Sequence, residues 1–489
     1  MSDFRMEFEE EAALPAVKTA KPIPLFIDLD GTLVKSDLLI ESLLALLRQA
    51  PWCLFLVPFW LMSGVARLKA EVAKRVVLAI ERLPLQEDFV AFLRETAGDG
   101  RAIYLATAST RLLAERVAEE IGLFSGVLAS DAKTNLKGIR KLKAIQEMSA
   151  GPFDYAGNSR SDVSIWAHAR HGVVVNPAPG VYAAARRHCQ VDALFEDRPS
   201  AFQSWMRALR VYQWMKNFLL GVPVLTAHAF TVKNAGAVAA AFLAFGMIAS
   251  SSYIINDMID LSADRFHPRK RKRPFAAGDI SLLAGLVGMI VPLATGLWLA
   301  TLLPHPFRLS IFAYLLLTMS YSFFLKTVVL LDVILLGALY TVRIIAGAAA
   351  IGVEISFWLL AFSMFVFFSI ALVKRSSELL TMEKMSETAA VGRDYRLSDY
   401  NTLNAMGIAS GYLSVLVLAL FINNPMVMEN YTHPNRLWLL CPLMLYWISR
   451  LWIKTSRGEM HDDPLLFSLK DRVSWLVLFA MMMTTLVAI

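Results

Sequence analysis

Long apolar segments fill the sequence from about residue 217 to its last residue. Nine of them approach the ~20 residues that a helix needs to cross the core of a bilayer. They cover residues 217–232, 235–255, 281–303, 307–325, 328–350, 356–373, 402–422, 436–454 and 471–489. The 489-residue chain is 56% hydrophobic and 18% charged, which is too apolar for one soluble globule. The sequence therefore predicts a membrane bundle of nine transmembrane helices.

Lysine and arginine gather in the loops on one side of these segments. The loops are residues 256–280, 325–327, 374–401 and 455–472. Because such loops stay in the cytoplasm, nine spans predict a multi-pass protein of the inner (plasma) membrane with a cytoplasmic N-terminal part. The net charge of +7 comes mainly from lysines and arginines in these loops, where anionic lipid head groups and phosphate substrates are the expected partners. Nucleic acid is not expected as a partner.

The composition of the chain changes near residue 200. Residues 21–198 alternate short apolar runs with amphipathic stretches, which is typical of a soluble α/β domain. We expect residues 1–20 to be a tail, residues 199–216 a linker and residues 217–489 an all-α membrane domain. The three scattered cysteines predict free thiols rather than disulfides or a metal cluster.

The run PIPLFIDLDGT places two carboxylates, Asp28 and Asp30, after a short apolar strand. In an open α/β sheet the carboxyl end of a strand opens onto the ligand crevice, so both can face one substrate. One aspartate can attack phosphorus while the other moves a proton and a hard cation neutralises the phosphate oxygens. A strand-end turn with capping acids remains the alternative.

Three further motifs, IYLATAS, TNLKG and YAGNSRSD, follow in that order. Together with PIPLFIDLDGT they resemble the motifs of haloacid dehalogenase-like hydrolases. The resemblance implies a Rossmann-type sheet with a helical cap at about residues 37–95 and a Mg²⁺-dependent phosphatase. It implies Asp28 as nucleophile, Asp30 as general acid/base, Thr107 as phosphate ligand, Lys137 as charge clamp, and Asn158 and Asp162 as metal ligands beside Asp28 and Asp30.

Two features of this domain leave alternatives open. Asn158 stands where the family usually has aspartate, and an amide brings less charge to Mg²⁺, so a degenerate, structural domain is the alternative to an active phosphatase. The cap stretch PWCLFLVPFWLMSGV is apolar but too short to span a membrane. It predicts an interfacial or domain-contacting helix, or a buried core of the cap.

The stretch NDMIDLSADRFHPRKRKRP holds three carboxylates at the cytoplasmic end of the second predicted span. Asp257, Asp260 and Asp264 are three and four residues apart, which puts them on one helical face. Ionisable residues at membrane depth indicate function, and Mg²⁺ with a substrate phosphate would relieve their mutual repulsion. A solvated loop of mixed charge explains the basic run that follows but not the ordered acids.

This stretch resembles the first aspartate-rich motif, NDxxDxxxD, of the UbiA superfamily of intramembrane prenyltransferases, which are nine-helix bundles. The resemblance covers residues 200–489 and implies Mg²⁺ bound by Asn256, Asp257, Asp260 and Asp264, with Asp257 and Asp260 catalytic. Where ordinary members carry a second acidic motif, this chain reads KRSSEL, with Lys374 and Arg375. Together with YSFFLK and YTVRIIAG, this exchange resembles the decaprenyl-phosphate phosphoribosyltransferase branch of the superfamily.

That branch joins a polyprenyl phosphate to phosphoribosyl diphosphate, and both substrates are anions that need cationic partners. The candidate phosphate-binding residues are Lys270, Arg273, Lys326, Arg343, Lys374 and Arg375, with Tyr321 as a further hydrogen-bonding group. Snorkelling or a helix-end position is the alternative for Lys326 and Arg343, and core packing is the alternative for Tyr321.

The resemblances predict a membrane transferase that moves 5-phosphoribose to polyprenyl phosphate with Mg²⁺, fused to a phosphatase that removes the 5-phosphate. One alternative is an aromatic polyprenyltransferase of the 4-hydroxybenzoate type with a fused hydrolase. A non-enzymatic transporter or scaffold is the other.

Overall fold

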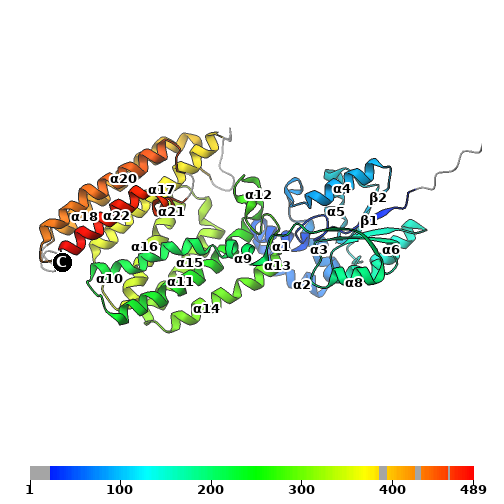
Figure 1. Cartoon of the computed structure of the whole chain (residues 1–489), viewed down its shortest axis with the longest axis horizontal. Coiled ribbons are helices and arrows are strands. Elements are labelled where there is room, and N and C mark those ends of the chain that lie inside the picture. The colour runs from blue at the N-terminus through cyan, green and yellow to red at the C-terminus, as the bar shows by residue number, and fades with distance from the viewer. Residues whose placement is uncertain (1–21, 385–393, 425–430, 461–462, 489) are drawn as a thin grey trace, which may run out of the picture. The chain divides into compact units, whose positions relative to one another are not determined.

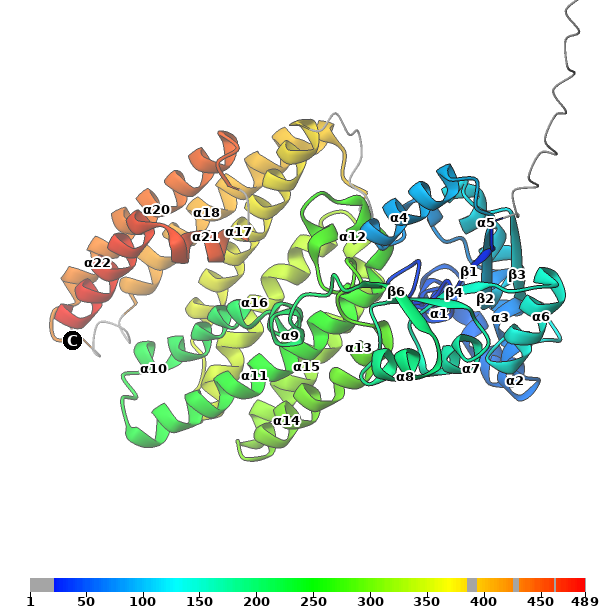
Figure 2. The same ribbon diagram turned by 45° about the vertical axis from the view of Figure 1, so that its right-hand side comes forward.

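The computed structural model of the chain describes residues 22–384, 394–424, 431–460 and 463–488. These residues form two compact units, which we call the N-terminal and the C-terminal unit (Figures 1 and 2). The N-terminal unit comprises Met1–Val34, Val57–Lys74 and Leu85–Asp197. The C-terminal unit comprises Lys35–Leu56, Arg75–Pro84 and Arg198–Ile489. Two pieces of the predicted cap, which interrupts the α/β domain in sequence, therefore pack with the C-terminal unit.

Six parallel strands form the sheet of the N-terminal unit, in the order β3-β2-β1-β4-β5-β6. The strands are β1 (Leu25–Ile27), β2 (Ile103–Thr110), β3 (Gly126–Ser130), β4 (Asp154–Gly157), β5 (His171–Val175) and β6 (Gln190–Phe195). All three residues of β1 are fully buried, as expected of a strand covered on both faces. The strand order reverses between β1 and β4, so the ligand crevice of this fold lies at their carboxyl ends.

Helices accompany this sheet in the N-terminal unit and confirm the predicted α/β class. They are α2 (Val57–Met62), α3 (Val65–Ala73), α4 (Glu87–Gly98), α5 (Arg111–Ile121), α6 (Ile139–Ser149), α7 (Val163–Trp166) and α8 (Val181–His188), with a 3-10 turn η3 (Arg160–Asp162). One part of the core joins Phe26 of β1 to Ile145 of α6 and Trp166 of α7. These contacts tie β1 to the helices and hold the strand end that carries Asp28.

The apolar cap stretch forms η1 (Pro51–Leu56) and α2, and none of its residues is buried. Trp52 is 81% exposed and Met62 86% exposed. The alternative of a buried cap core is therefore wrong. An interfacial role stays a prediction that an exposed apolar surface of this kind supports.

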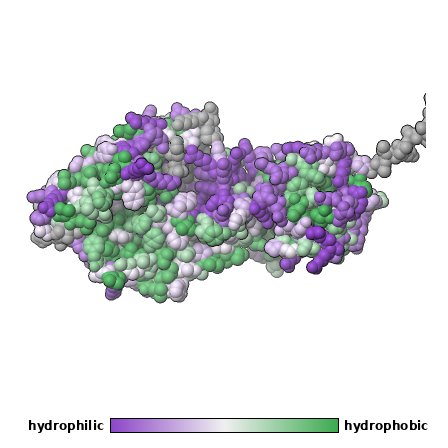
Figure 3. Space-filling view, viewed as in Figure 1, coloured by the Kyte–Doolittle hydropathy of each residue, from purple (hydrophilic) through white to green (hydrophobic). Residues whose placement is uncertain are grey.

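The C-terminal unit is helical. Its first elements are α1 (Leu38–Gln49), η2 (Ile80–Arg82), α9 (Ala201–Leu209), η4 (Val211–Gly221), α10 (Val222–Thr226), α11 (Val232–Ile259), α12 (Leu261–Phe266) and η5 (Lys270–Lys272). The later ones are α13 (Leu282–Gly288), α14 (Ile290–Thr301), α15 (His305–Phe323), η6 (Leu325–Thr327), α16 (Leu331–Ile351), α17 (Phe357–Lys384), η7 (Leu397–Asp399), α18 (Tyr400–Ile422), η8 (Pro434–Leu439), α20 (Leu440–Ser456), α21 (Pro464–Lys470) and α22 (Arg472–Ala488). Hydrophobic side chains cover much of the outer surface of this unit (Figure 3).

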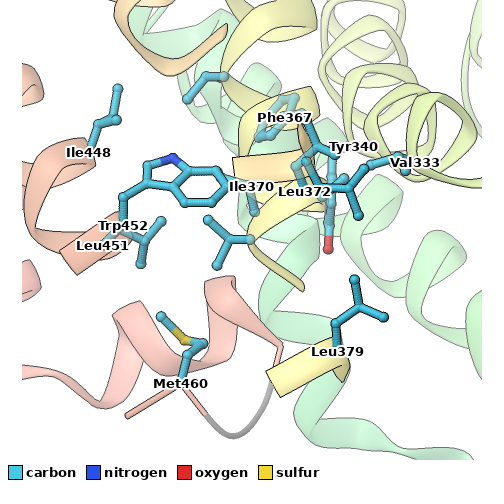
Figure 4. Packing of buried hydrophobic residues seen from close by; sticks show 14 of the residues in the cluster. Val333, Tyr340, Phe367, Ile370, Leu372, Leu379, Ile448, Leu451, Trp452 and Met460 are labelled. Atoms are coloured by element: carbon cyan, nitrogen blue, oxygen red, sulfur yellow. The ribbon is translucent and has the colours of Figure 1, made fainter. Parts of the chain in front are cut away.

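The bundle core forms where α16, α17 and α20 meet. Trp452 and Leu451 of α20 point toward Ile370 and Leu372 of α17 (Figure 4). The indole of Trp452 also donates a hydrogen bond to Ser369, 3.1 Å away, so its polar edge is satisfied inside the core.

The prediction of nine membrane spans is confirmed only in part. Among the described residues, five helices are long and apolar enough to cross a membrane, and a sixth counts if α21 and α22, bent by 86°, form one span. All nine predicted segments contain helix, but residues 217–232 are broken between η4, α10 and the start of α11. Mean hydropathy identifies apolar segments but does not show where a helix is interrupted, which explains the difference.

Candidate functional site

The first candidate site lies at the carboxyl ends of β1 and β4. Asp28 follows β1, and its carboxylate accepts a hydrogen bond from the Lys141 ammonium on α6 at 2.7 Å. The same ammonium lies 3.8 Å from Asp162 and donates to the Tyr155 hydroxyl at 3.0 Å. One buried cation therefore bridges two buried carboxylates and holds both side chains in fixed positions.

Electrostatics at Asp28 and Lys141 follow from this burial. Burial raises the pKa of Asp28, and the attraction of Lys141 offsets part of that rise. Burial alone would lower the pKa of Lys141, but Asp28 and Asp162 outweigh it and raise that pKa, so the ammonium stays charged. Burial and the two carboxylates raise the pKa of Tyr155 well above its ordinary value, so its phenol remains a donor to Asp162.

The structure brings Lys141, not Lys137, to Asp28. Lys137 is exposed in the loop before α6, whereas Lys141 lies one helical turn later and is buried. The motif TNLKG identified the correct region but the wrong lysine for this contact. Spacing along a helix could have indicated Lys141, because it shares the inward face of α6 with Ile145.

The end of β2 adds hydroxyl groups to this site. Ser109 donates a hydrogen bond to Asp30 at 2.6 Å, and its backbone N–H donates to the Thr107 hydroxyl at 2.9 Å. Thr107 is fully buried. The predicted residues Asp30 and Thr107 thus share Ser109 as a neighbour, which the sequence reading did not single out.

Oxygen donors for a magnesium ion are present on the turn after β1. Asp162 accepts from Tyr155 at 2.8 Å and from Ser159 N–H and hydroxyl groups at 2.9 and 2.7 Å, so its oxygens are satisfied by the protein. The Asn158 amide instead lies against the turn, since a Cβ on Gly31 would stand 2.1 Å from Asn158 Nδ2. No group of three His, Cys, Asp or Glu side chains forms a metal site in the described part of the chain. Asp28 and Asp30 follow β1 and Asn158 lies beside the same turn, so their carboxylate and amide oxygens are of the kind that a hard cation prefers, and the metal-ligand roles of these residues and of Asp162 stay predictions.

The second candidate site is the aspartate-rich motif at the end of α11. Asp257, 1% exposed, is paired with Arg210 and, at 3.0 Å, with Arg273. Arg273 also contacts Asp264 at 2.6 Å, and Lys326 of η6 pairs with Asp260. The predicted acids and two of the predicted cations therefore meet, together with Arg210 from the predicted linker.

Two buried oxygens of this motif differ from its other polar atoms in their hydrogen bonding. Asn256 Oδ1 and Asp257 Oδ2 are buried, and neither has a hydrogen-bond partner among the described residues. Buried oxygens of this kind are costly unless something positive satisfies them. Amide and carboxylate oxygens suit Mg²⁺, so the donor set fits the ion that the motif implies.

Asp264 occupies a separate environment on α12. Burial raises the pKa of Asp264 to about 6, against the lowering influence of Arg273 and the weaker one of Lys270. Lys270, in η5, thus lies close enough to act on Asp264 electrostatically. Arg273 contacts Asp257 as well as Asp264, so one guanidinium connects the first and the last acid of the motif.

The KRSSEL segment on α17 forms a third group of charges. Arg375 is 1% exposed; it contacts Asp332 at 2.5 Å and Tyr321 at 3.2 Å and pairs with Glu378. Tyr395 donates to the same Asp332 at 2.5 Å. The guanidinium of Arg375 is thus directed at protein oxygens, which places it to orient Tyr321 and Glu378.

A fourth group lies within the helical bundle. Lys216 pairs with Asp463 at 2.5 Å, and Arg343 donates to Asn217 at 3.1 Å and to Tyr314 at 3.4 Å. Arg343 is therefore held by partners inside the bundle and does not extend to its surface. Lys216 and Asn217 lie at the boundary between the predicted linker and the predicted membrane domain. Their contacts with Asp463 and Arg343 were not predicted from the sequence.

The long apolar helices are those of a multi-pass membrane protein, and the same chain carries an α/β unit. Residues 218–470 match the family model described as the UbiA prenyltransferase family. The chain belongs to this family.

Similar proteins extend over different parts of the chain. An uncharacterized protein, y4nM, of Sinorhizobium fredii is 37% identical over 466 residues, 94% of this chain and 89% of that protein. Nodulation protein NoeC of Azorhizobium caulinodans is 33% identical over 273 residues, 55% of this chain and 88% of that protein. Decaprenyl-phosphate phosphoribosyltransferase of Corynebacterium glutamicum is 34% identical over 184 residues, 37% of this chain and 55% of that protein.

Solved structures resemble each half at low identity. A UbiA homologue from Archaeoglobus fulgidus, bound to DMAPP and Mg²⁺, superposes with a TM-score of 0.45 at 18% identity, covering 58% of this chain and 99% of that chain. A phosphoserine phosphatase in apo form superposes with a TM-score of 0.27 at 15% identity, covering 36% of this chain and 94% of that chain.

Proposed function

We propose that the C-terminal unit transfers 5-phosphoribose from phosphoribosyl diphosphate to a polyprenyl phosphate. The observation that carries the proposal is the replacement of a second acidic motif by Lys374 and Arg375, beside a first motif whose acids meet Arg210, Arg273 and Lys326. Cations in this number suit two phosphorylated substrates better than a single prenyl diphosphate with a neutral aromatic acceptor. The likeness to decaprenyl-phosphate phosphoribosyltransferase supports the same substrates.

In the proposed reaction an oxygen of the lipid phosphate attacks the anomeric carbon of the ribose. The bond from that carbon to the diphosphate breaks, and the diphosphate leaves with its electron pair. Asn256, Asp257 and Asp260 would hold Mg²⁺, which supplies charge neutralisation to the leaving group. Lys326 and Arg273 lie beside these acids and are positioned to bind phosphate oxygens, which brings two anions together.

We propose that the N-terminal unit then removes the 5-phosphate from the product. The Asp28 carboxylate attacks phosphorus, Asp30 donates a proton to the departing ribose oxygen, and water later cleaves the aspartyl phosphate. Lys141 keeps Asp28 in place throughout, taking the role that the sequence assigned to Lys137. Thr107 and Ser109 are the hydroxyl groups near the incoming phosphate.

The proposed location of both steps is the cytoplasmic face of the inner membrane. The loops that carry Lys270, Arg273 and Lys326 are the basic loops, and the positive-inside rule assigns them to the cytoplasm.

The test uses the full chain in lipid nanodiscs with Mg²⁺, labelled phosphoribosyl diphosphate and polyprenyl phosphate. We expect a labelled lipid, and the variant Asp260→Asn should form it at least ~100-fold more slowly because a carboxylate ligand of the Mg²⁺ that neutralises the diphosphate is lost. Asp279→Asn is the matched control, since Asp279 lies in the loop after the motif and pairs with Arg207 of α9, 2.9 Å away. No labelled lipid, with transfer from a prenyl diphosphate to 4-hydroxybenzoate instead, would contradict the proposal.

Mass spectrometry of the lipid product tests the phosphatase step. Wild-type protein should yield polyprenyl phosphoribose, and Asp28→Asn should accumulate the 5-phosphorylated form. An unchanged ratio of the two products would assign the second step to another protein.

A further inference from the structure

A segment inserted in the α/β domain packs against the aspartate-rich motif. Lys35–Leu56 lies between the first two phosphatase-like motifs in sequence, yet it belongs to the C-terminal unit. Its helix α1 contacts α11 and α13. The insertion therefore supplies part of the surroundings of the motif at the end of α11.

A buried ion pair fixes this packing. Arg265 Nη1 and Nη2 donate to the two carboxylate oxygens of Glu41 at 2.9 and 2.7 Å, which is the bidentate geometry of a strong arginine–carboxylate pair. Arg265 Nε donates to the Ala276 carbonyl at 3.2 Å, and Ser36 donates to Glu41. Glu41 is 4% exposed and Arg265 is 8% exposed, so neither charge has water as an adequate substitute partner.

The pair has a direct connection to the proposed metal ligands. Arg265 follows Asp264 in α12, a helix of six residues that is too short to be stable on its own. The Ala276 carbonyl that Arg265 holds belongs to the loop that carries Arg273, which contacts both Asp257 and Asp264. Fixing Arg265 therefore fixes α12 on one side and the Arg273 loop on the other.

We propose that Glu41 is a positioning residue for the aspartate-rich motif, acting through Arg265 on Asp264 and Arg273. This inference rests on the proposed function for its catalytic consequence, but its structural part concerns the motif alone. It implies that the insertion in the α/β domain is needed for the geometry of the transferase site. Such a dependence gives a physical reason for carrying both domains on one chain.

The test measures Mg²⁺ binding by hydrogen exchange of the peptide covering residues 256–266, in the full chain and without substrates. Mg²⁺ alone should protect these amides, and Glu41→Gln should raise the Mg²⁺ concentration for half protection about 10–100-fold, the usual effect of losing an outer partner of a metal site. In a transfer assay, Glu41→Gln should lower kcat, and the Mg²⁺ concentration for half-maximal kcat should rise by the same factor as that for half protection. The KM for the lipid phosphate should change little. Glu81→Gln, an exposed glutamate on η2 in the same unit, is the matched control.

Glu41→Asp is a second variant for the case in which Glu41→Gln does not fold. It keeps the carboxylate charge on a side chain that is shorter by one methylene group. An intermediate Mg²⁺ requirement in Glu41→Asp supports the proposal even if Glu41→Gln does not fold. Wild-type Mg²⁺ requirements in both Glu41 variants, or an equal change in Glu81→Gln, would overturn it. Because protection by Mg²⁺ needs no substrate, failure of phosphoribosyl transfer would sink the proposed function without deciding the role of Glu41.

Discussion

Replacing Lys141 with methionine should destabilise the N-terminal unit by about 3–5 kcal/mol, the usual result of removing one partner of a buried ion pair. The ammonium lies 2.7 Å from Asp28 and 3.8 Å from Asp162, which corresponds to about 6 and about 4 kcal/mol of attraction at an effective dielectric constant of about 20. The desolvation of Lys141 itself offsets part of this attraction. Methionine fills a similar volume, so the change removes charge with little loss of packing.

Hydrogen exchange of the β1 amides, Leu25–Ile27, measures the effect as the free energy of opening of the sheet. Lys137→Met is the matched control, because Lys137 is exposed and the same substitution there should stay within about 0.5 kcal/mol. Adding Asp28→Asn to Lys141→Met should recover part of the loss, since it removes one of the two stranded carboxylates. Equal opening free energies for Lys141→Met and Lys137→Met would refute the reasoning.

Three further predictions concern other parts of the chain. Burial raises the pKa of Asp28 above its ordinary 3.8, and the proposed nucleophile must be ionised. The phosphatase kcat/KM should therefore decrease as the pH is lowered, with an acid-limb pKa above 3.8. Gly31→Ala should lower phosphatase kcat, because φ is +79° there and the new Cβ would stand 2.1 Å from Asn158; left-handed strain alone costs about 1–2 kcal/mol. In the bundle, Gly347→Ala places a Cβ 2.2 Å from a backbone carbonyl and should lower stability to thermal unfolding by about 1–3 kcal/mol, whereas Gly236→Ala, with nothing within 4 Å, should not.

The sequence predicted those features of the site that depend on local pattern. The apolar run before Asp28 made β1 recognisable. The spacing of Asp257, Asp260 and Asp264 predicted three acids on one face of a helix, whereas the structure ends α11 at Ile259 and places Asp264 in the separate α12. In both cases the chemistry follows directly on the element that positions it, so a short stretch of sequence holds the information.

Contacts between distant segments could not be predicted in the same way. Arg210 lies in a segment read as a linker, and only tertiary packing brings it to Asp257. Glu41 was part of a predicted cap, and nothing in its local sequence indicates that it meets Arg265, 224 residues later. The number of helices long enough to span the membrane also depends on the bend between α21 and α22, which hydropathy alone does not determine.

The charge pairs in the C-terminal unit suggest how one site could serve two anionic substrates. Each acid of the motif has a cationic partner outside its own helix: Arg210 for Asp257, Lys326 for Asp260, and Arg273 of the following basic run for Asp264. Without substrate, these pairs prevent the carboxylates from repelling one another and the cations from being buried alone. In the proposed reaction, a diphosphate bound with Mg²⁺ would give the carboxylates a divalent cation as partner, and Lys326 and the arginines would then be able to bind phosphate oxygens. Because these cations are already buried beside the carboxylates, the site would offer positive charge to a phosphate without a further desolvation of the cations.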